Sequence, residues 1–352
     1  MHTECYALYR LPYADSYTHI RSSRPPAIVA GYDDIGRMSG FVIAPFACSD
    51  AEKIIIIHAD EILSAAVPAD TSRDMQGMTP VGSQPATQPA EQYCKAFSRY
   101  HNAIAEGKFS KLVLARKRMQ ARINGESREE AAEIFFRACR TFPRLMIMLF
   151  STPESGTWII ASPEILVEGT GSHYHTVALA GTMPYSEGYA EWSEKNKREQ
   201  KVVESYIESI LSDVAEDIIK DGPTTMRAGS LAHLRTDFRF SLHGKEDGTS
   251  GNALGMLLSR LHPTPAVCGM PKEEAKNFIL RNEGMERRYY SGFAGPVDIS
   301  GETHLYVSLR CAEITEKAFW LYAGGGIMPD SLCLNEWKET EEKMKTISHV
   351  LR

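Results

Sequence analysis

The chain has 352 residues, of which 43% are hydrophobic and 24% are charged, and its formal net charge is −6. This length allows one large domain or two to three average domains, with enough apolar residues to bury a sizeable core. The acidic balance argues against a nucleic-acid partner, because nucleic-acid binders carry a basic balance or stripe. The N-terminus has no basic segment followed by an apolar core, and the apolar run at residues 53–62 is too short to span a bilayer.

Seven cysteines are scattered through the sequence, and no two of them form a CxxC pair. An odd number of cysteines without motif spacing is typical of reduced thiols in a cytoplasm, rather than of a disulfide framework or a zinc site. We therefore expect a soluble cytoplasmic protein with no membrane partner.

The N-terminal part of the chain predicts short strands in an antiparallel arrangement, separated by Pro, Gly and Asp signals. These strands are expected at residues 5–10, 26–32, 40–46 and 53–59. Residues 68–89 are rich in Thr, Ser, Gln, Gly and Pro, which is the composition of an exposed connection. We interpret this segment as a long surface loop within a single domain over residues 1–352. A boundary between two domains at the loop is the alternative.

A helix followed by a strand is predicted next. Residues 91–106 carry aromatic and aliphatic side chains every three or four positions, and Gly107 follows as a stop signal. The strand predicted over residues 111–119 begins with Lys111. A lysine at the start of a strand is most often a solvated charge, so the pattern alone gives it no role.

The middle of the chain predicts a helix over residues 127–141 and strands over residues 145–150 and 156–162. Glu164 lies just beyond the second strand, after Pro163. Carboxylates at such turns are usually surface charges.

A hairpin is predicted over residues 165–184, turning around two glycines. His173 and His175 are two residues apart, so they share one face of a strand. That spacing suits a metal, but no third ligand follows nearby, and we expect a solvated face there.

Residues 191–220 predict a long helix with an apolar stripe, and Glu199 lies on that stripe, four residues before Val203. A carboxylate directed toward a core needs a partner, because an unpaired buried charge is very costly, and a metal ion would serve. Farther along, the polar, glycine-containing residues 239–251 predict a loop, and residues 253–261 predict a helix.

Residues 303–314 predict one strand, in which Arg310 shares a face with small or hydroxyl-bearing side chains. A guanidinium in this place is either an ordinary edge charge or a planar fork for a carboxylate. The pattern leaves both interpretations open.

A run of three glycines follows the strand predicted over residues 318–323. Gly324, Gly325 and Gly326 either form a flexible turn or let a ligand approach the backbone closely. In the helix predicted after them, Glu336 and Glu339 share a face. Glu339 also precedes Lys343 by four residues, so the helix presents either a solvated ion pair or an acidic pair for a hard divalent cation.

Four segments of this last quarter resemble, in their order, the chorismate-utilising enzymes of the anthranilate synthase component I-like family. Within that family they are most similar to isochorismate synthases. The segments are LHPTPAVCG at 261–269, SLRCAEI at 308–314, AGGGI at 323–327 and EWKETEEK at 336–343. The similarity extends back through HL at 233–234, ALAGT at 178–182, SPE at 162–164 and KLVLAR at 111–116. Residues 1–90 carry no matching motif, so residues 91–352 are expected to form the catalytic core.

The resemblance implies an α+β chorismate-binding fold, in which large antiparallel sheets pack together with helices outside. It also implies that Lys111 is the general base that activates a water molecule and that Glu164 is the general acid. A lysine acts as a base near neutral pH only when its pKa is lowered by burial or by a nearby cation. A carboxylic acid that donates a proton near neutral pH needs a raised pKa, which an apolar pocket supplies.

The resemblance further implies a set of residues around the substrate. Aminodeoxychorismate synthases carry a covalently used lysine at the position where this chain has Ala180, so the chain differs from them there. Tyr290 and Arg310 are expected to hold a substrate carboxylate. The full substrate-binding set implied is Ala180, Gly181, Thr182, His233, Ala266, Val267, Tyr290, Arg310, Gly324, Gly325, Gly326 and Lys343.

The resemblance also implies a Mg²⁺ cofactor held by Glu199 and Glu339, with Glu336 beside them. Carboxylate oxygens are the ligands that this ion prefers. One position departs from the family pattern: family members often have histidine after the first of these glutamates, and this chain has Gln200.

The expected activity is the reversible, Mg²⁺-dependent isomerisation of chorismate to isochorismate, most simply for menaquinone biosynthesis. No glutaminase subunit is expected, and a monomer is the default for such enzymes. The alternatives are a siderophore pathway, a salicylate synthase that goes on to eliminate pyruvate, and a non-catalytic metabolite-binding protein. Lys111 and Ala180 argue against the ammonia-using anthranilate and aminodeoxychorismate synthases.

Overall fold

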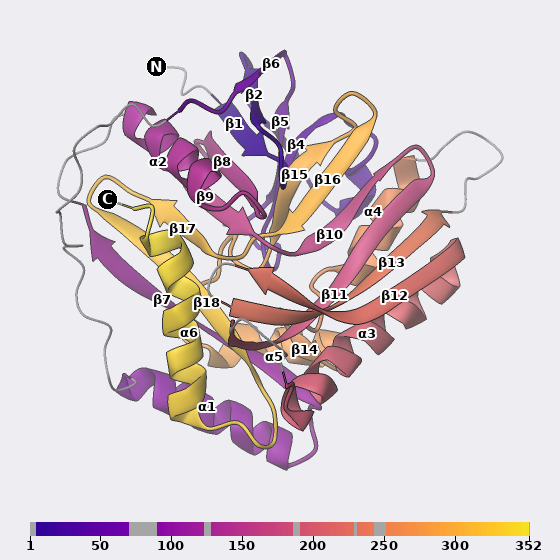
Figure 1. Cartoon of the computed structure of the whole chain (residues 1–352), viewed down its shortest axis with the longest axis vertical. Coiled ribbons are helices and arrows are strands. Elements are labelled where there is room, and N and C mark those ends of the chain that lie inside the picture. The colour runs from indigo at the N-terminus through magenta and orange to yellow at the C-terminus, as the bar shows by residue number, and fades with distance from the viewer. Residues whose placement is uncertain are drawn as a thin grey trace.

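Two large antiparallel sheets form the framework of this computed structural model, which describes residues 5–69, 90–122, 128–185, 191–228, 231–242 and 251–351 (Figure 1). The first sheet has the order β14 (Gly269–Met270), β7 (Lys111–Ala121), β18 (Ala318–Ile327), β17 (Cys311–Ile314), β9 (Gly156–Ser162), β8 (Met146–Thr152), β1 (Cys5–Arg10), β2 (Ser16–Ser22) and β6 (Glu61–Ala66). The second has the order β12 (Ala215–Ala228), β13 (Leu231–Leu242), β11 (His173–Pro184), β10 (Ile165–Thr170), β16 (Glu302–Val307), β15 (Phe293–Val297), β4 (Gly40–Ala44), β5 (Ile54–His58) and β3 (Ala27–Val29).

The helices cover the sheets from outside, so the predicted α+β class is confirmed (Figure 1). α3 (Glu194–Val214) and α4 (Gly251–Leu261) pack on the second sheet. α2 (Arg128–Thr141) and α6 (Cys333–Ser348) pack on the first sheet, and α1 (Glu91–Ala105) and α5 (Lys272–Asn282) lie against its β7 end. A short 3₁₀ helix, η1 (Tyr32–Asp34), contacts α4. None of the helices in the described part of the chain has the length and apolar composition that a membrane crossing needs.

The isoleucine run of β5 shows how the layers form. Ile55 and Ile57 pack between the two sheets, in a cluster that contains side chains from both. Ile54 and Ile56 point to the opposite face, where they join the cluster under α3 and α4. A continuous apolar strand therefore lies at the point where both of its faces are buried.

Strands from the first 66 residues join both sheets. β1, β2 and β6 pair within the first sheet, and β3, β4 and β5 pair within the second. The strands predicted at residues 5–10 and 40–46 are confirmed, with β4 ending earlier than predicted. The single domain predicted over residues 1–352 stays a prediction, since residues 70–89 lie outside the described part of the chain.

Two element boundaries were predicted wrongly in the middle of the chain. The helix predicted over residues 191–220 ends at Val214, and Ala215 is already extended because it begins β12. The loop predicted over residues 239–251 was wrong at its start, where residues 239–242 finish β13. In both cases the pairing of β12 with β13 decides the conformation. The rest of the predicted loop, residues 243–250, lies outside the described range.

The single strand predicted over residues 303–314 is in fact two strands in different sheets. β16 ends at Val307 in the second sheet, and β17 begins at Cys311 in the first. The link between them passes through Arg310, whose φ of 47° is left-handed and cannot continue a strand. Arg310 therefore lies at the crossing between the sheets and not on a strand face.

The glycine run does not form a turn. Gly324, Gly325 and Gly326 continue β18, where they pair with residues 113–115 of β7. Two adjacent strands thus carry the glycines and Lys111 side by side.

His173 is exposed as predicted, but His175 lies in a polar network, so the prediction of a solvated face was wrong at His175. Its Nδ1 lies 3.0 Å from Glu168 Oε1, and its Nε2 lies 2.7 Å from Asp237 Oδ1. Burial would lower the pKa of His175, but the hydrogen bonds to Asp237 and Glu168 outweigh burial and raise it. Burial would raise the pKa of Glu168, but the hydrogen bonds from His175, His304 and Tyr306 lower it to about 2.

Replacing His175 with glutamine is expected to destabilise the protein by about 1–3 kcal/mol near pH 6, since charged hydrogen bonds are lost. A histidine whose pKa is raised by folding stabilises the native state below its unfolded pKa, and this contribution disappears as pH rises through the folded pKa. The stability difference between wild type and H175Q should therefore shrink as pH rises. Urea unfolding at several pH values measures it, with H173Q as the exposed control on the same strand; a difference independent of pH would contradict the prediction.

Candidate active site

A pocket lies where β7, β11 and β18 meet α3 and α6. It encloses about 590 Å³ of space, part of it open to solvent. The predicted site residues that line it are Glu164, Ala180, Gly181, Thr182, Glu199, His233, Ala266, Val267, Tyr290, Arg310, Gly324, Gly326 and Lys343. Four other predicted site residues do not line the pocket but lie next to it, namely Lys111, Gly325, Glu336 and Glu339.

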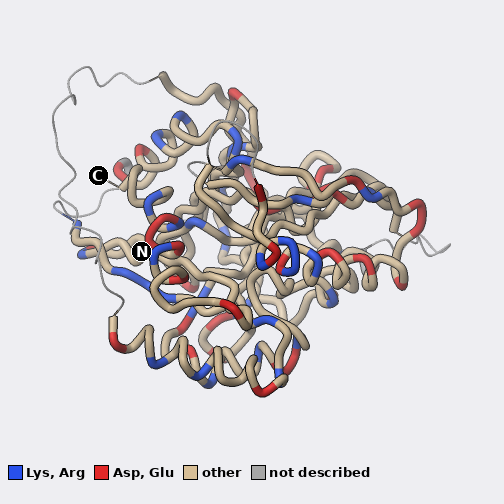
Figure 2. The backbone as a smooth tube through the Cα atoms, turned by 60° about the horizontal axis from the view of Figure 1, so that its bottom comes forward, with Lys and Arg blue, Asp and Glu red and all other residues tan. Residues whose placement is uncertain are grey.

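Charged residues are common throughout the molecule, but few of them are buried in the way that Lys111, Glu164 and Arg310 are at the pocket. Figure 2 shows basic and acidic residues interspersed along most elements, as expected for a chain with a modest net charge of −6. The buried charges beside the pocket therefore need individual explanations.

Lys111 begins β7 and is completely buried. Its Nζ lies 3.0 Å from Glu199 Oε1 on α3, which forms an ion pair at the edge of the pocket. Burial would raise the pKa of Glu199, but the Lys111 ammonium outweighs burial and lowers it. Glu199 is therefore an ionised carboxylate, and the apolar stripe of α3 tolerates it because Lys111 balances its charge.

Gly326 makes room for this ion pair. A Cβ at Gly326 would collide with Glu199 Oε1 and would lie 2.9 Å from Lys111 Cε. Gly325, the next residue back, faces the other side of β18, where a Cβ would lie 3.0 Å from Glu336 Oε2. The glycines therefore bring carboxylates close to the backbone on both faces of the strand.

Glu164 is buried on another wall of the pocket, with 3% of its surface exposed. Its backbone N–H donates to Ser162 Oγ at 3.2 Å, and its carbonyl accepts from Val307 N at 3.0 Å. Burial raises the pKa of Glu164 to about 8, although Lys111, Lys343 and Arg310 each act to lower it. Near neutral pH, Glu164 is therefore a carboxylic acid that can donate a proton.

His233 and Arg310 form a hydrogen-bonded pair in the pocket. Arg310 Nη2 donates to His233 Nε2 at 3.0 Å, so His233 carries its proton on Nδ1, which donates to the carbonyl of Gly181 at 3.0 Å. Burial first, and then Arg310 and Lys343, hold the pKa of His233 well below its usual range. Burial also lowers the pKa of Arg310 to about 10, which still leaves it cationic at neutral pH. The pocket thus contains a neutral imidazole and a buried guanidinium that can bind an anion.

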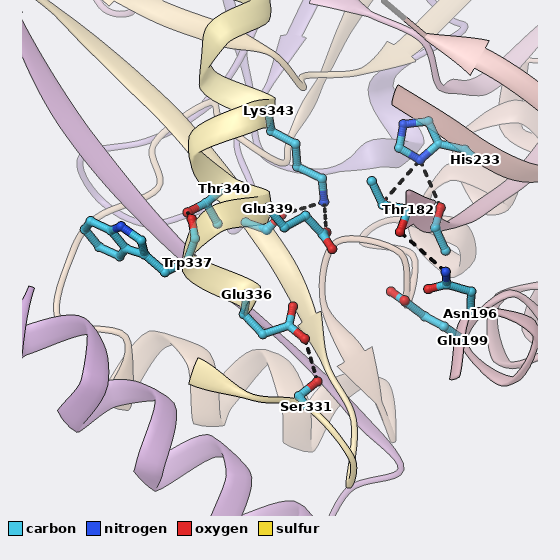
Figure 3. A network of polar contacts seen from close by, with 12 residues as sticks. Thr182, Asn196, Glu199, His233, Ser331, Glu336, Trp337, Glu339, Thr340 and Lys343 are labelled. Carbon is cyan, nitrogen blue, oxygen red and sulfur yellow. Dashed lines mark hydrogen bonds and ion pairs between the residues drawn. The ribbon is translucent and has the colours of Figure 1, made fainter. Parts of the chain in front are cut away.

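Three carboxylates point toward the region between α3 and α6, as Figure 3 shows for Glu199, Glu336 and Glu339. Each is paired with a lysine. Lys343 Nζ lies 2.7 Å from Glu339 Oε1 and donates to the carbonyl of Gly324 at 2.8 Å. Lys195 Nζ lies 2.5 Å from Glu336 Oε1. Sequence analysis missed Lys195, although it precedes Glu199 by four residues on α3 and therefore shares its face.

The carboxylate group fits a divalent cation chemically. Glu336 Oε2 is buried and has no hydrogen-bond partner among the residues that the structure describes. Burial together with Glu339 raises the pKa of Glu336. A buried oxygen without a partner is costly, and a cation would remove that cost. As they lie, no three His, Cys, Asp or Glu side chains within the described residues are close enough together to hold one ion. The paired lysines balance the negative charge of these carboxylates instead.

A second missed residue is Gln200, which is buried on α3 next to Glu199. Its side-chain amide binds the backbone of β11 behind Ala180. The only sequence signal was its departure from the family pattern. Nothing in the helical periodicity distinguishes a glutamine that binds a strand from one that faces solvent.

Comparisons with known proteins agree on one family. The model of a family described as chorismate binding enzymes matches residues 46–352. The vibriobactin-specific isochorismate synthase of Vibrio cholerae is 31% identical over 278 residues, covering 73% of this chain and 66% of that protein. Isochorismate synthase MenF of Escherichia coli is 30% identical over 260 residues, covering 71% of this chain and 57% of that protein. The chain thus aligns with slightly less than two thirds of the first of these two relatives and with less than three fifths of the second.

The fold comparison covers nearly the whole chain. The solved structure of MenF, the menaquinone-specific isochorismate synthase from Escherichia coli, superposes with a TM-score of 0.78 at 21% identity. It covers 99% of this chain and 89% of that one. The architecture of two packed antiparallel sheets is therefore the chorismate-binding fold.

Proposed function

The chain belongs to the chorismate binding enzyme family, and from that premise we propose that it is an isochorismate synthase, which converts chorismate to isochorismate. One observation carries the proposal. A buried carboxylic acid, Glu164, lines the pocket, and a buried lysine, Lys111, lies next to the pocket, close enough for its charge to lower the pKa of that acid. An acid and a base on two sides of one cavity match a reaction that adds water at one ring carbon and expels hydroxide at another.

Lys111 and Glu164 have complementary roles in this mechanism. Lys111 takes a proton from the water that attacks C2, and Glu164 gives its proton to the hydroxyl that leaves C4, while the double bonds shift. The transfer requires the neutral amine of Lys111, which a cation bound near Glu199 would favour. Glu199 then pairs with the ammonium that the transfer leaves. One water is consumed and one is formed, so the net reaction is an isomerisation and is reversible.

Arg310 and Lys343 supply positive charge for a dicarboxylate substrate. Arg310 is buried and cationic, and its hydrogen bond to neutral His233 fixes the plane of the guanidinium. Because a guanidinium can bind a carboxylate through two parallel hydrogen bonds, we propose Arg310 as the main anchor, with Tyr290 beside it. The pocket walls at Ala180 and Val267 complete the shape around the ring.

We propose Mg²⁺ as the cofactor, held by Glu199 and Glu339 with Glu336 next to them. The support is the oxygen of Glu336 that has no partner among the described residues, together with the direction of the three carboxylates toward the region between α3 and α6. When bound, the ion would draw negative charge toward the ring carboxylate of the substrate. Lys111, Lys195 and Lys343, which pair with these carboxylates, would then lose part of their contact with them.

Salicylate synthase is the second candidate, since it would use the same acid and base and then eliminate pyruvate. Incubating the purified protein with chorismate, with and without Mg²⁺, and separating the products by chromatography with mass detection distinguishes the two. We expect a Mg²⁺-dependent product of unchanged mass. Salicylate with pyruvate would instead support the second candidate, and no turnover would support a binding protein.

Menaquinone biosynthesis is the pathway that we propose. The relatives include both a siderophore-specific and a menaquinone-type enzyme, so a catechol siderophore pathway is the alternative. Deleting the gene in its source organism and measuring menaquinone and catechols separates them. We further propose that the enzyme acts as a monomer in the cytoplasm without a glutaminase subunit.

Replacing Gly326 with alanine is expected to reduce turnover about 10–100-fold, because the new methyl group displaces Glu199 from Lys111. Overpacking should also cost about 1–3 kcal/mol of stability. Steady-state kinetics with chorismate and a thermal melt measure both effects. Gly31→Ala is the control, since a Cβ there meets no atom of the described residues within 4 Å. Equal kinetics for the two variants would contradict the prediction.

A further inference from the structure

Gln200 makes hydrogen bonds with every polar atom of its side chain. It lies on α3 with 2% of its surface exposed. Its Oε1 accepts from the backbone N–H of Ala180 at 2.8 Å. Its Nε2 donates to the carbonyl of Ala178 at 3.0 Å and to Thr236 Oγ1 at 3.1 Å. These partners fix the orientation of the amide, because a backbone N–H only donates and a carbonyl only accepts.

This side chain matches its surroundings in a way that few others could. The site requires one acceptor and two donors at the end of a side chain two methylenes long. A carboxylate of the same length offers only acceptors, and a thioether offers no strong hydrogen bond. An imidazole offers one donor and one acceptor, so it could replace part of the set.

The strand segment that Gln200 holds is irregular. The pairing of β11 with β13 shifts register between Ala180 and Thr182, and Gly181 has a left-handed φ of 67°. Such a bulge locally disrupts the ladder and redirects side chains. Residues 180–182 are also a wall of the pocket. Their position therefore depends on side-chain contacts in addition to ladder hydrogen bonds.

Gln200 also connects this wall to the residues on the other side of the pocket. The preceding residue on α3 is Glu199, which pairs with Lys111 at 3.0 Å. One turn earlier, Asn196 Nδ2 donates to the carbonyl of Thr182 at 3.4 Å. The same stretch of helix thus contacts both the bulged wall and the proposed base.

We propose that Gln200 is a positioning residue, which clamps residues 178–182 to α3 and thereby fixes the distance between the pocket wall and the Lys111–Glu199 pair. For its effect on turnover, this inference rests on the proposed isochorismate synthase activity. Small displacements of a substrate-positioning wall can reduce a rate strongly without abolishing binding.

The experiment compares Gln200→Met, which keeps the length and removes the amide, with Gln200→His, which keeps one donor and one acceptor. Lys197→Met is the control, because Lys197 is exposed on α3 and its ion pair within the described residues is the local one with Glu194. Each protein is examined by hydrogen–deuterium exchange at residues 178–182, by thermal melting, and by steady-state kinetics with chorismate.

In Gln200→Met we expect exchange of the Ala180 amide to accelerate by at least about tenfold, since its acceptor is gone. We also expect kcat to fall about 10–100-fold, with KM changed by less than about threefold. Gln200→His should be intermediate in both, and Lys197→Met should match the wild type. If Gln200 acts through its hydrogen bonds, the exchange rate and kcat of the variants should follow the number of hydrogen bonds that each variant keeps. If its role is purely structural, they should follow the melting temperature instead.

Unchanged exchange in Gln200→Met would overturn the inference, and so would faster exchange with wild-type kcat. If the wild-type protein did not convert chorismate, the proposed function would fail separately. The exchange measurement would then still decide whether Gln200 clamps the strand.

Discussion

Replacing Lys111 with alanine is expected to lower kcat for chorismate by about 10³-fold, within the range that general-base catalysis contributes. The variant has no group at that position to take the proton from the attacking water. It also leaves Glu199 buried without its partner, which costs about 3–5 kcal/mol. Steady-state kinetics and substrate binding measured separately will show whether turnover or affinity is lost.

The control for this prediction is Lys108→Ala, three residues earlier, where the lysine is 65% exposed and pairs with Glu106. Lys111→Met serves as a second variant, because it keeps most of the volume if the alanine variant folds poorly. A kcat within about threefold of wild type in the folded variant would exclude Lys111 as the base.

Replacing Glu164 with glutamine should reduce kcat by about 10²–10⁴-fold, because the amide cannot donate a proton to the leaving hydroxyl in the way a carboxylic acid does. The shape of the pocket should be retained, so KM should change little. Glu154→Gln is the matched control, since Glu154 is exposed in the turn between β8 and β9. Kinetics of the two variants under identical conditions test the role of Glu164.

The pH dependence gives an independent test of the same acid. Burial raises the pKa of Glu164 to about 8, so the carboxyl group is protonated below that pH and ionised above it. Wild-type kcat should therefore fall as pH rises through about 8, and Glu164→Gln should lose this dependence. A wild-type profile that rises through the same range would contradict the assignment.

The architecture was predictable where the sequence pattern and the family resemblance agreed. The apolar run at residues 53–59 indicated a strand, which the structure has as β5, and the segments with family motifs indicated the fold. The boundaries that failed are those decided by distant pairing. Ala215 continues a helical periodicity, yet its partner is Leu242 on β13, and only the folded sheet brings them together.

The link at Arg310 shows a second limit of prediction from the sequence. Residues 303–314 alternate as one strand would, but the chain changes sheet after Val307. Local alternation reports which residues are apolar, and it does not report which sheet they join.

The chemistry of the site was less predictable than its residues. The motifs pointed to Glu164, but its raised pKa comes from burial by residues far apart in sequence. Lys195 and Gln200 had no motif, and their roles depend on Glu336 and on the backbone of Ala178, which the fold brings near. Polar contacts between remote segments leave no periodic signal in a single sequence.

The central claim is that this pocket adds water to chorismate at C2 while the C4 hydroxyl leaves, and isotope labelling tests it most directly. The purified enzyme is incubated with chorismate and Mg²⁺ in ¹⁸O-water, and the product is analysed by mass spectrometry at early times. We predict isochorismate that carries one ¹⁸O atom, located at C2. Isochorismate without the label, or no isochorismate at all, would contradict the claim.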